Sequence, residues 1–134
     1  MQLNRLDHVN VVTSNLDAMV AWYTDILGME SGARPSFPFP GAWMYAGEHA
    51  VLHLVGADDE PKSIDPKIEH FAISANGLGE LVARLDERGI EFGMNTVPDF
   101  PIIQVNVHDC DGNHIHIDFH ADELTDALRA RLDF

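Results

Sequence analysis

The chain contains the sequence LDHVNVVTSNLDAMVAWYTDILG at residues 6–28, and a related stretch occurs later. With an offset of 62 residues and one deletion, it aligns with IEHFAISANGLGELVARLDERG at residues 68–89. The alignment places His8 on His70, each after an acidic residue, and Gly28 on the glycine that ends the second stretch. Self-similarity at this length indicates two copies of one structural unit rather than a solenoid, which needs three or more repeats.

The similarity continues into a later pair of segments. AVLHLV at residues 50–55 matches NHIHID at residues 113–118, which places His53 on His116. Each copy therefore contains a histidine before its helix and a second histidine in a strand near its end. We expect the two copies to have the same order of elements.

Hydrophobic periodicity predicts that each copy consists of one strand, one helix and three further strands. Side chains of alternating polarity indicate the strands, and an apolar stripe at helical spacing followed by glycine indicates the helices. For the first copy we expect a strand at 6–13, a helix from Leu16 capped by Ser14 or Asn15 and closed by Gly28, and strands near 29–33, 42–47 and 50–56. For the second we expect a strand at 67–74, a cap at Asn76, a helix at 78–88 closed by Gly89, and strands near 90–95, 102–108 and 113–119.

The 134 residues, 46% of them apolar and 22% charged, are enough for one folded domain. We expect a single α+β domain with repeats at 5–56 and 67–120, a polar, proline-punctuated linker at 57–66, and a short amphipathic C-terminal helix at 121–133. The turn at 109–113 contains an Asp-Gly step that is typical of hairpins.

The composition excludes several kinds of partner. The formal net charge of −14 argues against a nucleic-acid or anionic-membrane surface, since phosphate binding needs clustered Lys and Arg. No apolar run reaches the roughly 18–20 residues of a membrane span, and the N-terminus lacks a signal-peptide pattern. Cys110 is the only cysteine, so we expect no internal disulfide and a cytoplasmic location.

Four of the eight histidines lie at positions that the repeat relates. Imidazole is a ligand for Zn, Fe, Ni and Cu, and histidines from separate strands can converge on one ion. We therefore predict a metal site formed by His8, His53, His70 and His116. For a single strand histidine, an ordinary surface or core role is the simpler interpretation, and it stands for the histidines outside the repeat. His114 is intermediate, because it shares a strand face with His116.

Side chains near these histidines are candidates for substrate contacts. Gln104 and Asn106 alternate with apolar residues, which gives their strand one polar face. Phe39 and Trp43, together with Phe37 and Tyr45, could line an aromatic pocket or simply pack in the loop and sheet. Both interpretations of the aromatic residues remain open.

The repeat, the stretch LDHVNVVTSNLDAMVAWYTDILGM and the segment DCDGNHIHI resemble the vicinal oxygen chelate superfamily, which includes glyoxalase I, bleomycin-resistance proteins and extradiol dioxygenases. The resemblance covers about residues 5–120. It implies two βαβββ modules that form a curved mixed sheet around a metal cup. It also places His8 and His70 at the first-strand ligand positions and His53 and His116 at the last-strand positions.

The chain departs from the family pattern at the last-strand positions, where a carboxylate is usual. With four neutral imidazoles the dication is not compensated, so the resemblance implies a substrate with two adjacent anionic oxygens. The loss of the carboxylate base favours an Fe(II) dioxygenase of the extradiol kind over glyoxalase-type lyase or isomerase chemistry. Zn, Ni or Mn remain alternatives to Fe(II), and Tyr45 or His114 are candidates for proton transfer.

Two further expectations follow from the resemblance. Related chains often pair so that each cup combines units of two subunits, which implies a homodimer in which His8 and His53 of one chain meet His70 and His116 of the other. A cup within one chain is the alternative. The acidic charge and the aromatic loop also suit a metal-free protein that binds a cationic drug, as bleomycin-resistance proteins do, although such members usually lack the metal histidines.

Overall fold

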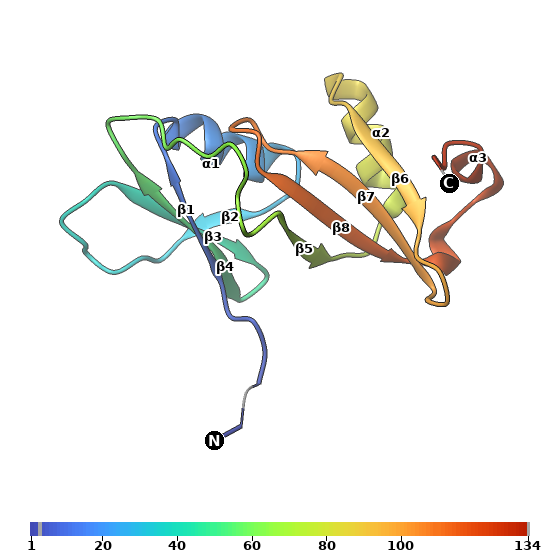
Figure 1. The fold of residues 1–134 in the computed structure, drawn as a ribbon, viewed down its shortest axis with the longest axis horizontal. Coiled ribbons are helices and arrows are strands. Elements are labelled where there is room, and N and C mark those ends of the chain that lie inside the picture. The colour runs from blue at the N-terminus through green and yellow to red at the C-terminus, as the bar shows by residue number, and fades with distance from the viewer. Residues whose placement is uncertain (3, 134) are drawn as a thin grey trace. The chain divides into compact units, whose positions relative to one another are not determined.

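The computed structural model describes residues 1–2 and 4–133. It divides the chain into two compact units, Met1–Ile64 and Asp65–Phe134, and the boundary falls inside the segment that the sequence predicts as a linker. Each unit begins with one strand and one helix and continues with three strands (Figure 1). The α+β class with two βαβββ modules is therefore confirmed, and each module forms its own four-stranded mixed sheet.

The first unit has the sheet order β1-β4-β3-β2, in which β1 and β4 are parallel and the other pairs are antiparallel. Its elements are β1 (Val9–Thr13), α1 (Leu16–Asp25), β2 (Glu30–Gly32), β3 (Gly41–Ala46) and β4 (His49–Gly56).

The second unit has the equivalent order β5-β8-β7-β6, with β5 parallel to β8. Its elements are β5 (His70–Ser74), α2 (Leu78–Arg88), β6 (Phe92–Thr96), β7 (Ile102–His108) and β8 (His114–His120), followed by a 3-10 turn η1 (Ala121–Glu123) and α3 (Asp126–Arg129).

Strand alternation separates a buried face from a half-buried polar face in the second unit. Along β7 and β8 the buried positions are apolar, and the positions between them carry amide, imidazole or carboxylate groups. The helix α2 buries its own apolar stripe, and it runs beside the strands of its sheet in Figure 1. This core contains Leu78, Leu81, Val82, Leu85, Met94, Ile103, Val105, Val107, Ile115, Ile117 and Phe119.

The first unit buries the corresponding face of its sheet against α1. Met44, Leu52 and Leu54 are at most 1% exposed, and Met19 and Tyr23 of α1 are fully buried. The helix ends at Asp25, a few residues before Gly28, which has a φ of 69° as the chain turns into β2.

The helix α2 occupies the residues that the sequence predicts, and Gly89 ends it in the left-handed conformation with a φ of 63°. Its beginning differs from the expected cap at Asn76. The cap residue is Gly77, and the carboxylate of Glu123 accepts hydrogen bonds from the N–H groups of Gly77 and Leu78, both at 2.7 Å. A side chain from more than forty positions further along the chain thus satisfies two unpaired donors at the helix N-terminus.

The C-terminal helix α3 is shorter than the predicted segment 121–133, which is divided into η1, α3 and a non-helical end that bonds to β6. Asp133 donates its N–H to the carbonyl of Met94 at 2.7 Å, and its carboxylate accepts the N–H of Met94 at 2.9 Å. The guanidinium of Arg131 bonds the carboxylate of Asp86 and lies 5.0 Å from the ring centroid of Phe92. The tail thereby covers the free edge of β6.

The turn between β7 and β8 is built around a buried carboxylate. Asp109 is 5% exposed, and its Oδ1 accepts the N–H groups of Asp111 at 3.0 Å and Asn113 at 2.9 Å. Gly112 takes a φ of 88°, which glycine adopts without strain. The carboxylate of Asp109 therefore has a structural role in this turn.

Among the residues that the structure describes, no helix has the length and apolar character needed to cross a bilayer.

Candidate metal centre

In the first unit, three aromatic rings form one stack. His8 lies immediately before β1, and its ring centroid is 3.8 Å from that of His53 on β4. On its other face the ring of His53 stacks on that of Trp43 from β3, with the centroids 4.0 Å apart and the planes nearly parallel. Trp43 and His53 are direct cross-strand partners, so the sheet register creates this contact. The structure thus brings together His8 and His53, while Trp43 as a substrate contact stays a prediction.

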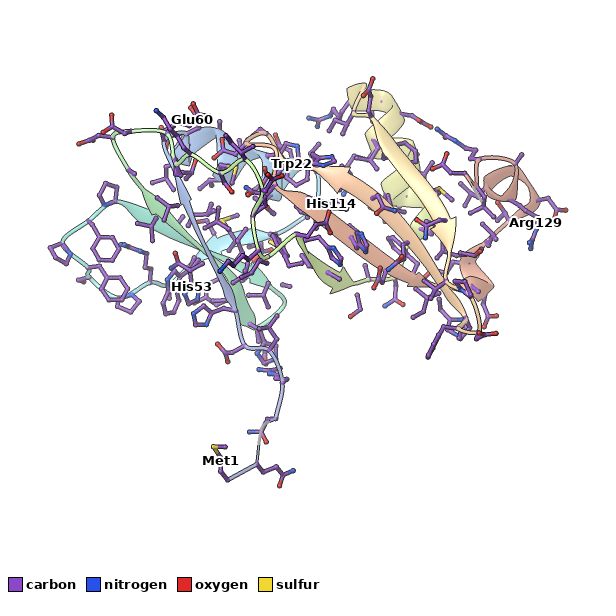
Figure 2. The ribbon with its side chains drawn as sticks, viewed as in Figure 1. Met1, Trp22, His53, Glu60, His114 and Arg129 are labelled. Carbon is purple, nitrogen blue, oxygen red and sulfur yellow. The ribbon has the colours of Figure 1, made fainter. Side chains whose placement is uncertain are left out.

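In the second unit, the equivalent pair has the same geometry. His70 at the start of β5 stacks on His116 of β8, with centroids 3.9 Å apart and planes at 12°. His114 is the direct strand partner of His70, at 5.4 Å between centroids, and it lies edge-on to His116 at 4.8 Å. Figure 2 labels His53 on the first sheet and His114 on the second. Two histidine pairs at repeat-equivalent positions are therefore formed, and the sharing of one ion by all four stays a prediction.

The acidic residue before each first-strand histidine holds the imidazole ring. The carboxylate of Asp7 is 2.8 Å from Nδ1 of His8, and this hydrogen bond lowers the pKa of Asp7. The carboxylate of Glu69 bonds Nδ1 of His70 and also Nδ1 of His114, the latter at 2.7 Å. These two hydrogen bonds lower the pKa of Glu69 to about 2. A carboxylate on one ring nitrogen orients the other nitrogen, as is usual for histidines that bind metals.

These carboxylates modify the expectation of an uncompensated dication. Asp7 and Glu69 are anionic at neutral pH, and each lies one hydrogen bond away from a predicted ligand. The negative charge is thus supplied behind the imidazoles rather than by a ligand.

The last-strand histidines are more shielded than the first-strand ones. Burial is the largest cause that lowers the pKa of His53, followed by the nearby His8. Burial also lowers the pKa of His116, with His70 and His114 adding to the effect. Both rings are therefore neutral at pH 7, which is the form that binds metals.

A chain of three amides connects His114 to His116 across β8, β7 and β6. Nε2 of His114 lies 3.2 Å from Oδ1 of Asn106, and the amide nitrogen of Asn106 donates to Oδ1 of Asn95 at 2.7 Å. Asn95 donates to Oε1 of Gln104 at 3.2 Å, and Nε2 of Gln104 lies 3.1 Å from Nδ1 of His116. Gln104 and Asn106, which we predicted as substrate contacts, thus contact histidines, and their role in substrate binding stays a prediction.

The donor set of the second unit fits a divalent metal. One nitrogen from each of His70, His114 and His116 lies within 4.8 Å of the others. For His70 and His116 the hydrogen bonds described involve Nδ1. Nε2 of His70 is therefore left to coordinate an ion, whereas Nε2 of His116 carries the ring proton while Nε2 of Gln104 donates to its Nδ1. Asp118, on the same face of β8, has a buried Oδ1 without a hydrogen-bond partner among the described residues. Such an atom needs a donor or a cation.

Phe39 lies in the loop between β2 and β3, and Tyr45 lies near the end of β3. The hydroxyl of Tyr45 donates to the carbonyl of Ala33 at 2.6 Å, so proton transfer through it would require breaking that bond. Phe39 stacks on Phe37, with Arg34 about 5 Å from both rings. A proton-transfer role for Tyr45 and substrate binding by Phe39 stay predictions.

The sequence analysis missed the residues that orient the histidines. The repeat aligns Asp7 with Glu69, and their position next to the histidines was the available signal for a supporting role. Asn95 joins the polar face of the second sheet only because β6 pairs with β7. No pattern among its neighbours in the sequence therefore identified it.

Comparison with known proteins identifies relatives of this fold. An Arabidopsis thaliana protein named Glyoxylase I 4 is 30% identical over 125 residues, which are 87% of this chain and 71% of that protein. A glyoxylase/bleomycin resistance protein/dioxygenase domain from Frankia sp. has the same fold, with a TM-score of 0.73 at 19% identity over 92% of this chain and 96% of that one.

A lactoylglutathione lyase from Agrobacterium tumefaciens also shares the fold, with a TM-score of 0.67 and 18% identity over 89% of this chain and 96% of that one. The model of one protein family matches residues 5–117, which span both repeats. This chain therefore belongs to the Glyoxalase/Bleomycin resistance protein/Dioxygenase superfamily.

Proposed function

We propose that this protein is a divalent-metal-dependent enzyme that binds two adjacent oxygen atoms of a small substrate. One observation carries the proposal. Each unit independently stacks a carboxylate-anchored histidine on a second histidine, at positions related by the internal repeat. A surface role for these histidines would not require the same pair, with the same acidic partner, in both halves.

In this proposal His8, His53, His70 and His116 hold the ion. When bound, a divalent metal supplies a Lewis acid that stabilises adjacent anionic oxygens, and Fe(II) additionally supplies redox chemistry with O₂. The residues around it have separate tasks. Asp7 and Glu69 orient first-strand rings, Gln104 and Asn106 present amides on the same face of the second sheet, and Trp43 supplies an aromatic surface beside His53.

Oxygen chemistry of the extradiol kind is the activity that we propose first. Its support is the absence of a carboxylate at the last-strand positions, where His53 and His116 stand. A carboxylate base is needed for glyoxalase-type proton transfer, and imidazoles bound to a metal are poor replacements. The substrate class is a catecholate or another small molecule with two neighbouring anionic oxygens.

A glyoxalase-type lyase is the second candidate, and the 30% identity to a protein named Glyoxylase I 4 favours it. In this case the proton would be carried by Tyr45 or His114. Because the two candidates need different metals and substrates, they are separated by direct assay.

The first experiment measures metal content. Protein purified without a histidine tag should bind one divalent ion per site by elemental analysis and calorimetry, and His70→Ala should lose it. His108→Ala is the matched control, because His108 is an exposed strand histidine outside the predicted ligand set. Wild-type protein that binds no divalent metal would contradict the proposal and favour a metal-free drug-binding protein.

The second experiment measures turnover. Anaerobically loaded Fe(II) protein should consume O₂ with one member of a catechol panel. Absence of O₂ uptake, together with conversion of a methylglyoxal–thiol adduct by the Ni or Zn protein, would replace the dioxygenase proposal by the lyase.

We also propose that the protein is a homodimer with metal sites shared between subunits. A mixture of two double variants tests this arrangement. One variant lacks His8 and His53, the other lacks His70 and His116, and each is expected to bind metal more weakly than the wild type. A mixed dimer with shared sites regains one complete set of four histidines and therefore tight binding, whereas sites within single chains gain nothing from mixing.

A further inference from the structure

The second unit contains a third imidazole that the four-histidine site does not use. His114 is the direct strand partner of His70 and lies two residues before His116 on the same face of β8. The three rings contact one another, with centroid distances from 3.9 to 5.4 Å. One nitrogen from each ring lies within 4.8 Å of the other two.

The carboxylate of Glu69 bridges two of these three rings. It bonds Nδ1 of His70 with one oxygen and Nδ1 of His114 with the other. Both rings are thereby held by the same nitrogen, which directs their Nε2 atoms away from the carboxylate. The hydrogen bond described for Nε2 of His114 is the 3.2 Å contact to Oδ1 of Asn106, which a metal bond can replace.

The first unit lacks this arrangement. The repeat places Val51 where the second unit has His114, and the side-chain hydrogen bond described for Asp7 is the one to His8. A third imidazole beside the pair is thus a property of the second unit and not of the repeated fold.

We propose that the second unit by itself forms a divalent-metal site from His70, His114 and His116, with Glu69 as the residue that positions two of the rings. The inference rests on the proposed function only in that His70 and His116 are ligands. Three neutral imidazoles with a carboxylate behind them suit Zn²⁺, Co²⁺ or Ni²⁺ with an open position for water or substrate.

The test uses the full chain with the first-unit histidines removed. His8→Ala/His53→Ala protein should still bind one Co²⁺, measured by calorimetry and by the visible absorption of the bound ion. In this background His114→Ala should weaken binding by more than about tenfold, since removal of a ligand costs more than removal of an outer partner. His108→Ala, which removes the neighbouring imidazole 5.0 Å from His114, should leave the affinity unchanged.

The role of Glu69 is tested in the same background. Glu69→Gln should weaken Co²⁺ binding by about 10- to 100-fold. Glu91→Gln removes the same charge from an exposed position of the second unit and should have no effect. Circular dichroism and thermal unfolding of each variant identify losses that come from misfolding, and Glu69→Asp should restore part of the affinity.

The outcomes distinguish the inference from the proposed function. Loss of all binding in His8→Ala/His53→Ala overturns the inference and leaves the four-histidine site intact. Equal affinity with and without His114 overturns it as well. An affinity of His8→Ala/His53→Ala equal to that of the wild type overturns the four-histidine site but supports the inference, and wild-type protein that binds no metal overturns both.

Discussion

The amide of Gln104 controls which nitrogen of His116 carries the proton. In the described orientation Nε2 of Gln104 donates to Nδ1 of His116, so the ring proton of the neutral imidazole is on its own Nε2. Coordination through that Nε2 requires the proton to move to Nδ1, and the amide must then present its oxygen. Asn95 and Asn106 continue this series of hydrogen bonds to His114. Reversing the orientation of one amide therefore affects the orientation of the others.

Gln104→Glu should therefore increase metal affinity, by about tenfold, because a carboxylate accepts the Nδ1 proton of His116 permanently. Calorimetry at neutral pH measures the effect. Gln104→Leu, which removes donor and acceptor together, should lower the affinity. A weaker affinity for Gln104→Glu than for the wild type would contradict this account of the amide.

Gln104→Glu should also reduce the stability of the fold. Position 104 is directly opposite Asp118, and like charges at such a pair repel. Adding Asp118→Asn should recover the free energy of unfolding in urea titrations. No recovery would indicate that the carboxylates do not interact.

At this scale the sequence predicted the histidines but not their supports. The repeat relates His8 to His70 and His53 to His116, and each unit stacks its two histidines, whereas their role as ligands stays a prediction. Glu69 as a bridge between two rings could not be predicted, because His114 lies 45 residues away and becomes its neighbour only through the parallel pairing of β5 and β8.

Among the elements, α2 depends on a distant residue for its N-terminus. Glu123→Ala should lower the free energy of unfolding by about 1–2 kcal/mol, because two N–H groups at the positive end of the helix lose a charged acceptor. Chemical denaturation measures the change. Asp122→Ala is the neighbouring control and should have little effect, since its ion pair with His120 is exposed. Equal effects of both substitutions would contradict the capping role.

The tail also contributes through Arg131 and Asp86. The hydrogen bonds from Arg131 lower the pKa of Asp86 below its ordinary value of 3.8. A lowered pKa means that the pair stabilises the folded state above pH 3.8, and that this contribution disappears as the pH falls through the pKa of the folded protein. The part of the stability difference between the wild type and Arg131→Gln that comes from this ion pair should therefore be present at pH 7, small because the pair is exposed, and disappear in acid. The contact of Arg131 with the ring of Phe92 is lost in the variant at every pH. A difference that is as large in acid as at pH 7 would contradict this origin.

Local patterns predicted α2 and the strands of the second sheet well, because an uninterrupted apolar stripe and strict alternation are properties of neighbouring residues. The beginning of α2 was wrongly expected at a cap by Asn76, since its acceptor comes from Glu123. The predicted helix at 121–133 was too long because contacts with residues distant in the sequence also determine the conformation of this segment. Tertiary bonds such as that of Asp133 to the edge of β6 draw the segment out of helical geometry.

At the scale of the whole molecule, the longest run of exposed residues in the described part of the chain connects the two units. Residues 58–70 are all exposed and lack helix, and they contain Lys62 and Lys67. Limited trypsin treatment should therefore divide the chain first after one of these lysines, because exposed irregular segments are cleaved most readily. Mass spectrometry identifies the fragments. A first dividing cut after Arg84 or Arg88, inside α2, would show that the helix opens more readily than the linker.

The first half has Val51 at the position where the second half has His114. This difference has a consequence for the engineering of this protein. Among the described residues, the additional imidazole with its bridging Glu69 is found in the second half and not at the equivalent position of the first. The halves are therefore not interchangeable. A symmetric chain fused from two copies of the second half would contain a surplus of donors, and one fused from two first halves would retain pairs alone.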